Sequence, residues 1–551
     1  MTTAVNGGRH RTRGVTGLLR SYGPLAAAAI AFVVMAAFVE PLPRIQRTVA
    51  AAPTEQELGD VGTGSLDNPT GSTVPGQVAA PTRVGARPRG SAPPGATPCT
   101  DRARQVPGDP YSPPCYAFSG NNGGTTSRGV SSNDIIVTAR QLEGPSAAEI
   151  FASISGESVD NSEENVKDTI QAIADYFNTH FQMYGRKMRI EYFNGEGNGA
   201  SELLGGGKEK ALADAIRAAK EKGAFADISG LTIPYADALA RNKVVNIGAP
   251  YPSRKWFVDH RPYAWSLFPD GTNVVEAHSS WITSRLVGRP VEFSGPEFIG
   301  RPRKYAVVAP ENAEYQESVN AYIAKVAGAG FNIALNMKYK LDINTMPNQA
   351  SNIIAQLKDA GITSILCGCD PVMLAIGLTP KANEQNYQPE WITAGLAFVE
   401  QDIVSQLIDK TQWQHSFGIA YNAESEPQGR SFPHAAYKTM RPNDEPAFGV
   451  EEVYYQFYML AIGIQMAGPN LTPESFEQGM FAYPGGSGPR GGWGFGPGDY
   501  TPMDDFREIW WDPNRISPQN NKPGAWVQLN NGARYRKGTV PHEGAPFFKA
   551  G

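Results

Sequence analysis

The feature that most constrains this chain is a regular alternation of short apolar runs and amphipathic segments after Gly129. Short runs rich in β-branched residues are typical of strands buried on both faces of a sheet, and amphipathic segments between them are typical of helices. We expect strands at IIVTARQ from Ile135, RKMRIEYFN from Arg186, FADISGL from Phe225, VVNIGAP from Val244, KYAVVAP from Lys304, ITSILCG from Ile362, EWITAGLA from Glu390 and SFGIAY from Ser416. We expect helices at 162–183, 208–222, 234–242, 273–286, 313–329 and 347–360.

This alternation predicts an α/β protein with parallel sheets and right-handed crossovers. It breaks near Arg261, in the aromatic, aperiodic segment YPSRKWFVDHRPYAWSLFPDG, and resumes at Tyr305. Two halves joined there would enclose a cleft between the carboxyl ends of their strands. A helical run at 448–468 and the strand-like DFREIWWDP follow, which we interpret as a return to the first half and then to the second. The expected boundaries are 129–268 with 421–492 for the first lobe, 269–420 with 493–535 for the second, and 536–551 for a tail.

The N-terminal region has the order of an export signal. Four arginines, at positions 9, 11, 13 and 20, precede the uncharged run Leu25–Val39. Those fifteen residues rise about 23 Å as a helix, short of the bilayer's hydrocarbon thickness, so a cleaved signal peptide and a retained membrane anchor both remain open for 1–40. No cysteine follows the run for lipid attachment. The positive flank places the rest of the chain outside the cytoplasm, and the Pro-, Gly- and Ser-rich segment 41–98 is expected to be a disordered linker.

The four cysteines fall into two pairs. Cys99 and Cys115 bracket a short loop at the start of the region 99–128, and in an oxidising exterior we expect them to form a disulfide. Cys367 and Cys369 form a C-x-C sequence at the end of an apolar run. Alternate strand residues point to opposite faces, so a bond between them needs a bend at Gly368, and we expect two buried thiols.

Charge and motifs argue against several functions. There are 49 Lys and Arg against 54 Asp and Glu, a net charge of −5, which gives no basic excess for a nucleic acid. The sequence contains no G-x-S-x-G, H-E-x-x-H, C-x-x-C or phosphate-loop motif, and its seven histidines form no i, i+4 pair. We therefore expect no enzyme activity, no metal and no cofactor.

One order of segments resembles a known family: GVSSNDIIVTARQ, ADISGLTIPYADALARNKVVNIGAP, YAWSLFPDGTNVVEAH, KYAVVAPENAEYQES, ITSILCGCDPV, EWITAGLA and DFREIWWDP. This order, over about 129–535, resembles the type 1 periplasmic binding proteins, particularly the branched-chain amino acid (Leu/Ile/Val-binding-like) receptors of ABC importers. The resemblance implies two Rossmann-like lobes, joined by three crossovers, that close on a solute.

The resemblance also implies a set of ligand-binding residues. In the first lobe, backbone amides and a hydroxyl after the third strand would hold a solute carboxylate. Asp370 would either pair with a ligand ammonium or cap a helix before Pro371. The first-lobe residues implied are Gly230, Leu231, Thr232, Ala249, Pro250, Tyr251 and Ser253. The second-lobe residues implied are Tyr315, Cys369, Asp370, Gly395, Leu396 and Ala397.

The chain departs from the receptors it resembles at several of these positions. Leu231, Ile233 and Pro234 stand where hydroxyl residues are expected, and Leu396 to Phe398 are apolar where an acidic residue is expected, with Glu400 displaced. Aromatic residues crowd the segment before the first crossover: Tyr251, Trp256 and Trp265. They are either core residues or a stacking surface, and together these departures suggest a larger or less polar solute than an amino acid.

The function expected from the resemblance is that of a monomeric, extracytoplasmic solute-binding protein with an ABC permease as its membrane partner and a small amino-acid-like, amide or carboxylate ligand. A cell-surface sensor on the same fold is the alternative, and a hydrolase with a dispersed active site is a remote one.

Overall fold

The computed structural model describes residues 87–142, 160–427 and 429–542. The chain divides into two units, 1–86 and 87–551, and the first lies wholly outside the described residues, together with the expected signal or anchor at 1–40. Within the described ranges, no helix is both long enough and apolar enough to cross a membrane.

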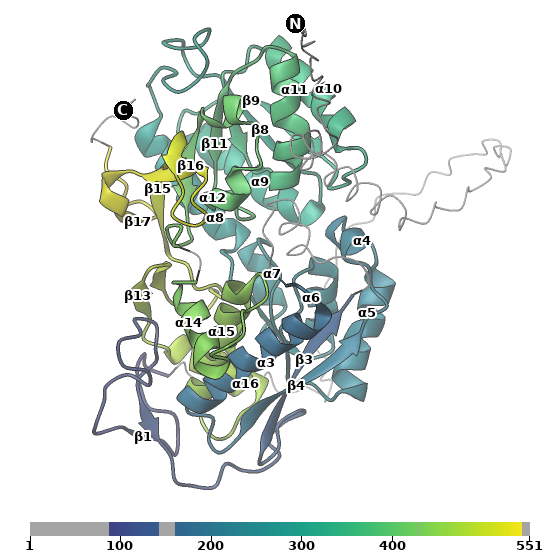
Figure 1. The fold of residues 1–551 in the computed structure, drawn as a ribbon, viewed down its shortest axis with the longest axis vertical. Coiled ribbons are helices and arrows are strands. Elements are labelled where there is room, and N and C mark those ends of the chain that lie inside the picture. Colours follow the sequence, from purple (N-terminus) through teal and green to yellow (C-terminus); the bar gives the residue numbers. More distant parts are fainter. Residues whose placement is uncertain (1–86, 143–159, 428, 543–551) are drawn as a thin grey trace, which may run out of the picture. The chain divides into compact units, whose positions relative to one another are not determined.

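The first sheet has five parallel strands in the order β4-β3-β5-β6-β7. Figure 1 labels two of them, β3 and β4. Ile135, Val137 and Ala139 of β3 point into a core shared with α3 and α15, and a smaller core under α5 and α6 is separate from it. The strands are β3 Asp134–Gln141, β4 Lys187–Asn194, β5 Ala226–Asp227, β6 Val245–Ile247 and β7 Ala264–Trp265. The helices are α3 Glu163–His180, α4 Gly199–Leu203, α5 Lys208–Ile216, η1 Arg217–Glu221, α6 Ile233–Arg241 and α7 Arg254–Asp259.

The second sheet runs β16-β15-β12-β11-β10-β8-β9, and β17 pairs with β15. Strands β8 to β12 are parallel, whereas β15, β16 and β17 are antiparallel additions to the expected sheet. The strands are β8 Tyr305–Pro310, β9 Ile333–Tyr339, β10 Ser364–Cys367, β11 Glu390–Thr393, β12 Ser416–Ala420, β15 Asp505–Ile516, β16 Pro523–Gln528 and β17 Arg534–Arg536. The helices are α8 Gly271–Arg285, α9 Ala313–Gly328, α10 Met346–Asp359, η2 Met373–Leu378, α11 Thr379–Glu384, α12 Asp402–Ser405 and α13 Lys410–Trp413.

The chain passes between the two sheets three times: between β7 and α8, after β12, and before β15. After the second passage, α14 Phe432–Met440 and α15 Val450–Ala467 pack against α3, and α16 Pro473–Ala482 packs against α15. A small hairpin of β13 Gly486–Gly488 and β14 Gly491–Trp493 precedes the third passage. The α/β class and the two lobes joined by three crossovers, expected from the sequence, are confirmed.

The elements that the sequence did not predict include the strands β7 and β9 and the helix α7. β9 is an edge strand, IALNMKY, whose residues are mostly half-buried, so it lacks the continuous apolar run of an interior strand. The helix α7 and the two-residue strand β7 lie inside the segment interpreted as aperiodic. Both elements are too short for their periodicity to be visible in the sequence.

An N-terminal arm, residues 87–128, packs on the first lobe. Its short ribbon joins β1 Thr97–Pro98 to β2 Tyr116–Ala117, and the predicted disulfide between Cys99 and Cys115 is confirmed. The Tyr111 hydroxyl donates to Gly491 O at 2.9 Å. Residues 87–98, expected to belong to the linker, are folded here, since Arg87 donates to Met466 O and Arg89 to Phe495 O. Composition alone does not reveal such long-range hydrogen bonds.

The expectation of two free thiols at Cys367 and Cys369 is wrong, because the structure joins them in a disulfide. Strand β10 ends at Cys367, so Gly368 and Cys369 no longer follow the extended path. The two Cα atoms are 5.0 Å apart, less than the roughly 6.6 Å that two residues of strand span. The bend at Gly368 therefore brings both sulfurs to one side of the chain.

Candidate functional site

Loops that follow the carboxyl ends of the parallel strands bring the two lobes into contact. Tyr251 follows β6 in the first lobe, and its hydroxyl oxygen accepts a 2.8 Å hydrogen bond from the Ala397 amide, which follows β11 in the second. Phe268, in the first crossover, has its ring centroid 5.6 Å from that of Tyr251 and 5.5 Å from that of Phe398. Two loops that the resemblance assigned to the ligand site thus meet through a hydrogen bond and aromatic contacts.

The same two loops hold strained backbone. Ala249 and Tyr251 have φ of 33° and 69°, and Ala397 and Phe398 have φ of 51° and 64°. Non-glycine residues avoid this left-handed region because Cβ crowds the backbone, at a cost of about 1–3 kcal/mol each. Such residues concentrate where surrounding structure holds a binding or catalytic loop in place.

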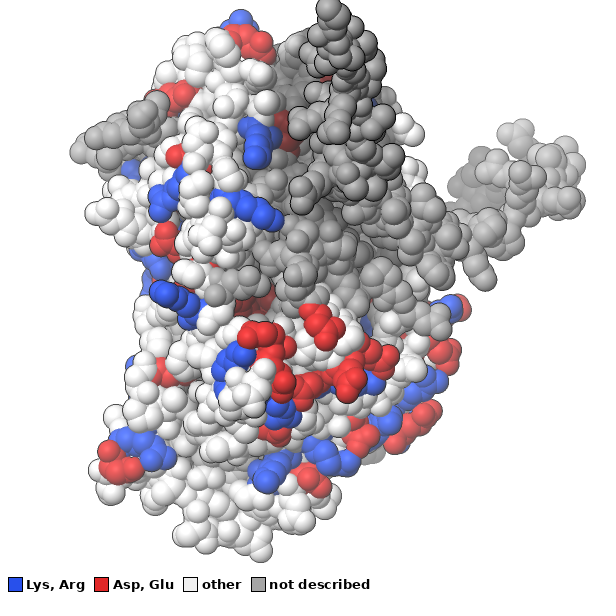
Figure 2. All heavy atoms as spheres, viewed as in Figure 1, with Lys and Arg blue, Asp and Glu red and all other residues white. Residues whose placement is uncertain are grey.

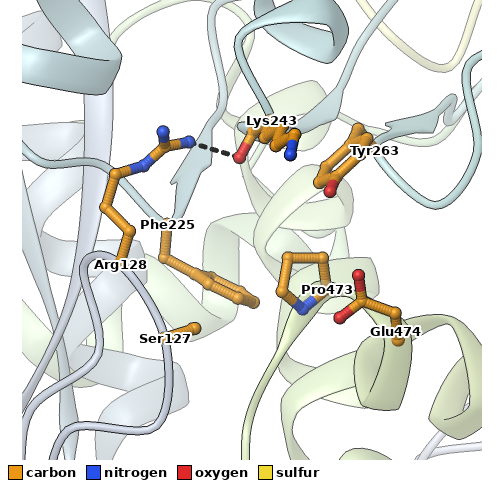
Figure 3. A pocket seen from close by; sticks show the side chains of 7 residues that line it. All are labelled: Ser127, Arg128, Phe225, Lys243, Tyr263, Pro473 and Glu474. Carbon is orange, nitrogen blue, oxygen red and sulfur yellow. Dashed lines mark hydrogen bonds between the residues drawn. The ribbon is translucent and has the colours of Figure 1, made fainter.

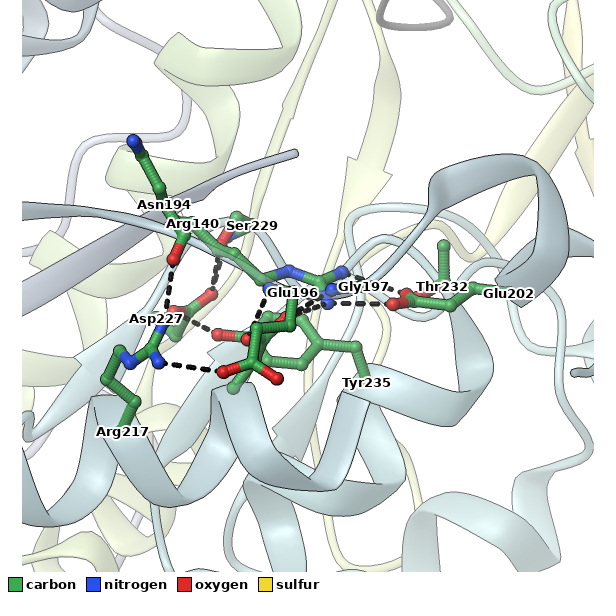
Figure 4. A network of polar contacts seen from close by, with 11 residues as sticks. Arg140, Asn194, Glu196, Gly197, Glu202, Arg217, Asp227, Ser229, Thr232 and Tyr235 are labelled. Atoms are coloured by element: carbon green, nitrogen blue, oxygen red, sulfur yellow. Dashed lines mark hydrogen bonds and ion pairs between the residues drawn. The ribbon is translucent and has the colours of Figure 1, made fainter. Parts of the chain in front are cut away.

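In the first-lobe loop after β5, the Thr232 hydroxyl is bonded to a carboxylate of the chain itself. Gly230 is buried and its carbonyl accepts from the Ala249 amide at 2.8 Å, whereas the Leu231 side chain is 48% exposed. The Thr232 hydroxyl donates to Glu202 Oε2 of α4 (Figure 4). The hydroxyl that the resemblance assigned to a solute carboxylate is therefore bonded to a carboxylate of the chain itself.

Glu202 belongs to a buried polar network at the carboxyl ends of β3 and β5 (Figure 4). Arg140 binds both Glu202 oxygens at 2.8 Å and Asp214 at 3.1 Å, and its guanidinium lies 3.5 Å from the centroid of the Tyr235 ring. Asp214 in turn accepts from the amides of Glu196 and Gly197. All three charged side chains are almost fully buried.

Asp227 forms the inner end of this network. Its carboxylate accepts from the hydroxyls of Thr138 at 2.7 Å and Tyr235 at 3.0 Å, and from the amide and hydroxyl of Ser229 at 2.7 Å each. Burial raises the pKa of Asp227, although the hydrogen bonds from Thr138 and Ser229 oppose the shift. The network therefore carries more negative than positive formal charge.

In the second lobe, Asp370 acts as a helix cap. Its Oδ1 accepts from the amides of Val372 and Met373 at 2.9 and 3.0 Å, and the Tyr339 hydroxyl donates to Oδ2 at 2.7 Å. Burial raises the pKa of Asp370. Of the two interpretations left open by the sequence, these contacts match the helix cap.

The remaining predicted residues are distributed around the contact between the lobes. Ser253 accepts from the Trp256 amide at the start of α7 and donates to Glu317 of α9 at 3.2 Å. Tyr315, also on α9, is half-buried, and burial raises its pKa to about 12. Cys369 is buried in its disulfide, and Gly395 adopts φ 67°. Pro250 and Leu396 are half-buried beside these loops.

Sequence reasoning missed a second polar network near the crossovers. Asn422 donates to Glu400 Oε1 at 2.7 Å and accepts from Arg490 at 2.6 Å. Glu400 is 2% exposed, and its Oε2 has no hydrogen-bond partner among the described residues. Burial raises the Glu400 pKa to about 7. Glu400 was noticed as a displaced acidic residue, but nothing in the sequence links it to positions so far along the chain.

Neither of two cavities in the described residues is lined by a predicted ligand-binding residue. One of about 270 Å³ is lined by Phe225, Lys243 and Tyr263, which lie one or two residues before β5, β6 and β7, together with Ser127, Arg128, Pro473 and Glu474 (Figure 3). It therefore lies at the amino edge of the sheet, opposite the predicted ligand loops. The other, about 10 Å³ and with room for about one water, is lined in part by Glu400 and Arg507.

Within the described ranges, no group of three or more His, Cys, Asp or Glu residues is placed to hold a metal ion.

Acidic side chains gather on the first lobe over α3 and α15 (Figure 2). Both helices carry glutamates in their first turns, at 163 and 164 and at 451 and 452, where the helix dipole favours negative charge.

The fold is similar to that of solved solute-binding proteins of ABC transporters. One, from Rhodopseudomonas palustris HaA2, was solved with p-hydroxybenzoic acid, and it is 11% identical with a TM-score of 0.52, covering 74% of this chain and 98% of its own. A substrate-binding protein from Aeropyrum pernix is 14% identical with a TM-score of 0.52, covering 74% and 97%. A third, from R. palustris BisB5 with 3,4-dihydroxybenzoic acid, is 11% identical with a TM-score of 0.51, covering 73% and 98%.

The sequence model of the periplasmic binding protein family matches residues 151–512. The chain belongs to this family, which confirms the resemblance drawn from the sequence. No curated protein matches the chain significantly. The family is that of the periplasmic binding proteins, and the similar structures have the same fold.

Proposed function

We propose that the protein is an exported receptor that closes its two lobes on a small molecule and delivers it to an ABC permease, without chemical turnover. Family membership supports the receptor role and an extracytoplasmic location. The basic and apolar N-terminal segment supports export, with the linker serving as a tether if the apolar run is retained. Mass spectrometry of the mature chain from its host distinguishes a retained anchor from a cleaved signal.

The observation that carries this proposal is the hydrogen bond from the Ala397 amide to the Tyr251 hydroxyl. It joins the lobes at the loops where ligands of open α/β sheets bind, beyond the carboxyl ends of the strands. A contact of this kind stabilises one relative position of the lobes, and a solute that contacts both loops would shift the population further toward it.

The ring-bearing residues of the site suggest a solute with an apolar body. Tyr251, Phe268 and Phe398 form a continuous aromatic group at the lobe contact. The two R. palustris proteins were solved with hydroxylated benzoic acids, which makes ring compounds a sensible first part of a ligand panel. Their low identity leaves the ligand of this chain to be found by experiment.

A thermal-shift screen of the full-length chain, purified in detergent, tests the proposal. The panel contains amino acids, amides, aromatic acids, aromatic amines and sugars. A solute at 100 times its Kd stabilises the folded state by about 2.7 kcal/mol, enough for a measurable rise in the melting temperature. A hit that is recovered unchanged after incubation supports a receptor, whereas conversion of the compound would support an enzyme. Uptake of the hit that is lost when the gene is deleted supports the permease partnership.

A further inference from the structure

We propose that Glu202 is a built-in carboxylate that determines solute specificity, so that the solute carries no carboxylate and its polar end is an organic amine. This inference rests on the proposed function, because it concerns the solute bound between the same two lobes. It names a specificity residue and a chemical class of solute.

The first step concerns the start of α6. A helix N-terminus attracts one anion, because its first amides lack acceptors within the helix and its dipole is positive there. Here Thr232 adds a hydroxyl donor immediately before the helix. The anion that takes the hydroxyl is Glu202 Oε2, on a side chain with 1% exposure. A solute carboxylate would find this donor already in use.

The second step is that Glu202 is fixed in place. Arg140 holds both of its oxygens at 2.8 Å, and Arg140 is itself held by Asp214 and the face of Tyr235. Displacing Glu202 would leave a buried guanidinium with half of its ion pairs, a costly arrangement. A bound solute is therefore expected to leave Glu202 in its place.

The third step places Glu202 beside the contact between the lobes. Its neighbour Leu203 is 49% exposed, and the Leu203 carbonyl accepts a 3.2 Å hydrogen bond from Asn312 of the second lobe. Asn312 precedes α9, which carries Tyr315. The short helix α4 thus reaches from the first lobe to the second at the predicted ligand loops.

The fourth step is the local charge. The buried network has one cation, Arg140, against three carboxylates, those of Glu202, Asp214 and Asp227, a formal excess of two negative charges. At short range and low dielectric such an excess repels an anion and attracts a cation. Burial raises the pKa of Asp227 and so favours its neutral form, which leaves Glu202 and Asp214 against Arg140, an excess of at least one negative charge.

The second lobe holds two buried acceptors on segments that follow the carboxyl ends of β11 and β12. Glu400 Oε2 and the Tyr421 hydroxyl are buried acceptors without partners among the described residues, and the electrostatic effect of Glu400 extends to both Tyr251 and Tyr421. An ammonium group supplies donors for such oxygens, and the rings of Tyr251, Phe268 and Phe398 can stack on the body of the solute or on its cation.

Three compounds with the same ring and similar chain length separate the alternatives: phenylethylamine, phenylalanine and 3-phenylpropionate. We expect calorimetry on the full-length protein to show at least tenfold tighter binding of phenylethylamine than of the other two. Tighter binding of 3-phenylpropionate or phenylalanine overturns the inference and leaves the proposed function standing. If none of the three compounds binds, a library with equal numbers of amines, zwitterions and acids is screened. Binding of acids overturns the inference alone. Binding of no compound in the library overturns the proposed function as well.

Variants of Glu202 test the residue directly. Glu202→Ala removes the anion bonded to Thr232 and one of the two carboxylates paired with Arg140. We therefore expect 100 mM acetate to raise the melting temperature of this variant but not of the wild type, and 3-phenylpropionate to gain at least tenfold in affinity. Glu209→Ala, at an exposed position of the neighbouring helix, is the control. If Glu202→Ala does not fold, Glu202→Gln keeps the shape and removes the charge, and unchanged selectivity among the three compounds overturns the proposal.

Discussion

The amide of Ala397 and the hydroxyl of Tyr251, 2.8 Å apart, join the two lobes through residues that both have left-handed backbone. Because each residue is held in a strained conformation by its own lobe, the bond forms only when the lobes bring the two loops together. It is therefore a specific stabiliser of the arrangement of the lobes in this structure.

Tyr251→Phe should shift the lobes toward the open state by roughly 1 kcal/mol, the usual net contribution of one hydrogen bond. Spin labels at two exposed positions, Lys210 in the first lobe and Lys325 in the second, would report a larger share of long distances. The matched control is Tyr192→Phe, which removes a hydroxyl bonded to Lys167 O within the first lobe. Equal distance distributions for Tyr251→Phe and the wild type would contradict the prediction.

Tyr111→Phe should destabilise the folded chain by about 1–3 kcal/mol, because it leaves two buried backbone groups without partners. The Tyr111 hydroxyl donates to Gly491 O at 2.9 Å and accepts from the Arg490 amide at 2.8 Å, so the arm supports the segment before the third crossover. Urea unfolding measures the loss. Tyr535→Phe, whose half-buried hydroxyl accepts from Asn530, should change stability by less than about 0.5 kcal/mol.

All four cysteines should resist alkylation in denaturant without reductant, because the structure pairs Cys99 with Cys115 and Cys367 with Cys369. Mass spectrometry should find no label before reduction and four labels after it. Labels on Cys367 and Cys369 alone would restore the free thiols expected from the sequence. Replacing Cys99 and Cys115 by serine should cost roughly 3 kcal/mol, the chain-entropy value for a loop of this length.

Asp370→Ala should lower stability by about 0.5–2 kcal/mol through loss of the helix cap. Asp370→Asn keeps an acceptor for the amides of Val372 and Met373 and should cost less. Thermal unfolding of the two variants compares them. Equal losses for Ala and Asn would show that the carboxylate charge, and not the cap, is what this position supplies.

Stability should fall as the pH rises from about 4.5 to 7, because burial raises the Glu400 pKa from 4.5 to about 7 and the folded state holds its proton more tightly than the unfolded state. The contribution is complete below pH 4.5 and is lost as the pH passes 7, a change on the order of 3 kcal/mol. The side chains that oppose this shift are Arg507, Asn422 and Arg490, and Glu400 in turn raises the pKa of Tyr251 and Tyr421. Unfolding of Glu400→Gln across this range should show a smaller pH dependence, and an unchanged slope would assign the effect elsewhere.

Much of the fold was predictable because it is encoded locally. The interior strands β3, β8, β10 and β12 were visible as apolar runs, and α3, α9 and α10 as amphipathic segments with their ends within a few residues of those observed. The sequence predicted a strand at DFREIWWDP, which lies in β15, but not its antiparallel pairing with β16 and β17. The pairing of strands depends on partners far along the chain.

The candidate site was predictable only as a set of loops. The sequence, through the family resemblance, indicated that the segments around Thr232, Tyr251 and Ala397 belong together, and two of these residues are in contact. It gave no sign that Glu202 accepts a hydrogen bond from the Thr232 hydroxyl, and it left open whether Asp370 binds a ligand or caps a helix. Those assignments depend on which side chains lie within hydrogen-bond distance of a given atom in the folded protein, and spacing along the chain does not specify that.

By itself, the sequence determined the α/β alternation, the expectation of export and the Cys99–Cys115 disulfide, because each follows from periodicity, composition or a short loop. Only the tertiary structure decided that Cys369 turns back to Cys367, that residues 87–98 are folded, and that Glu202 lies at Thr232. The physical reason is range: local backbone preferences and burial patterns act over a few residues, whereas these contacts depend on how distant loops are placed when the sheets and helices pack.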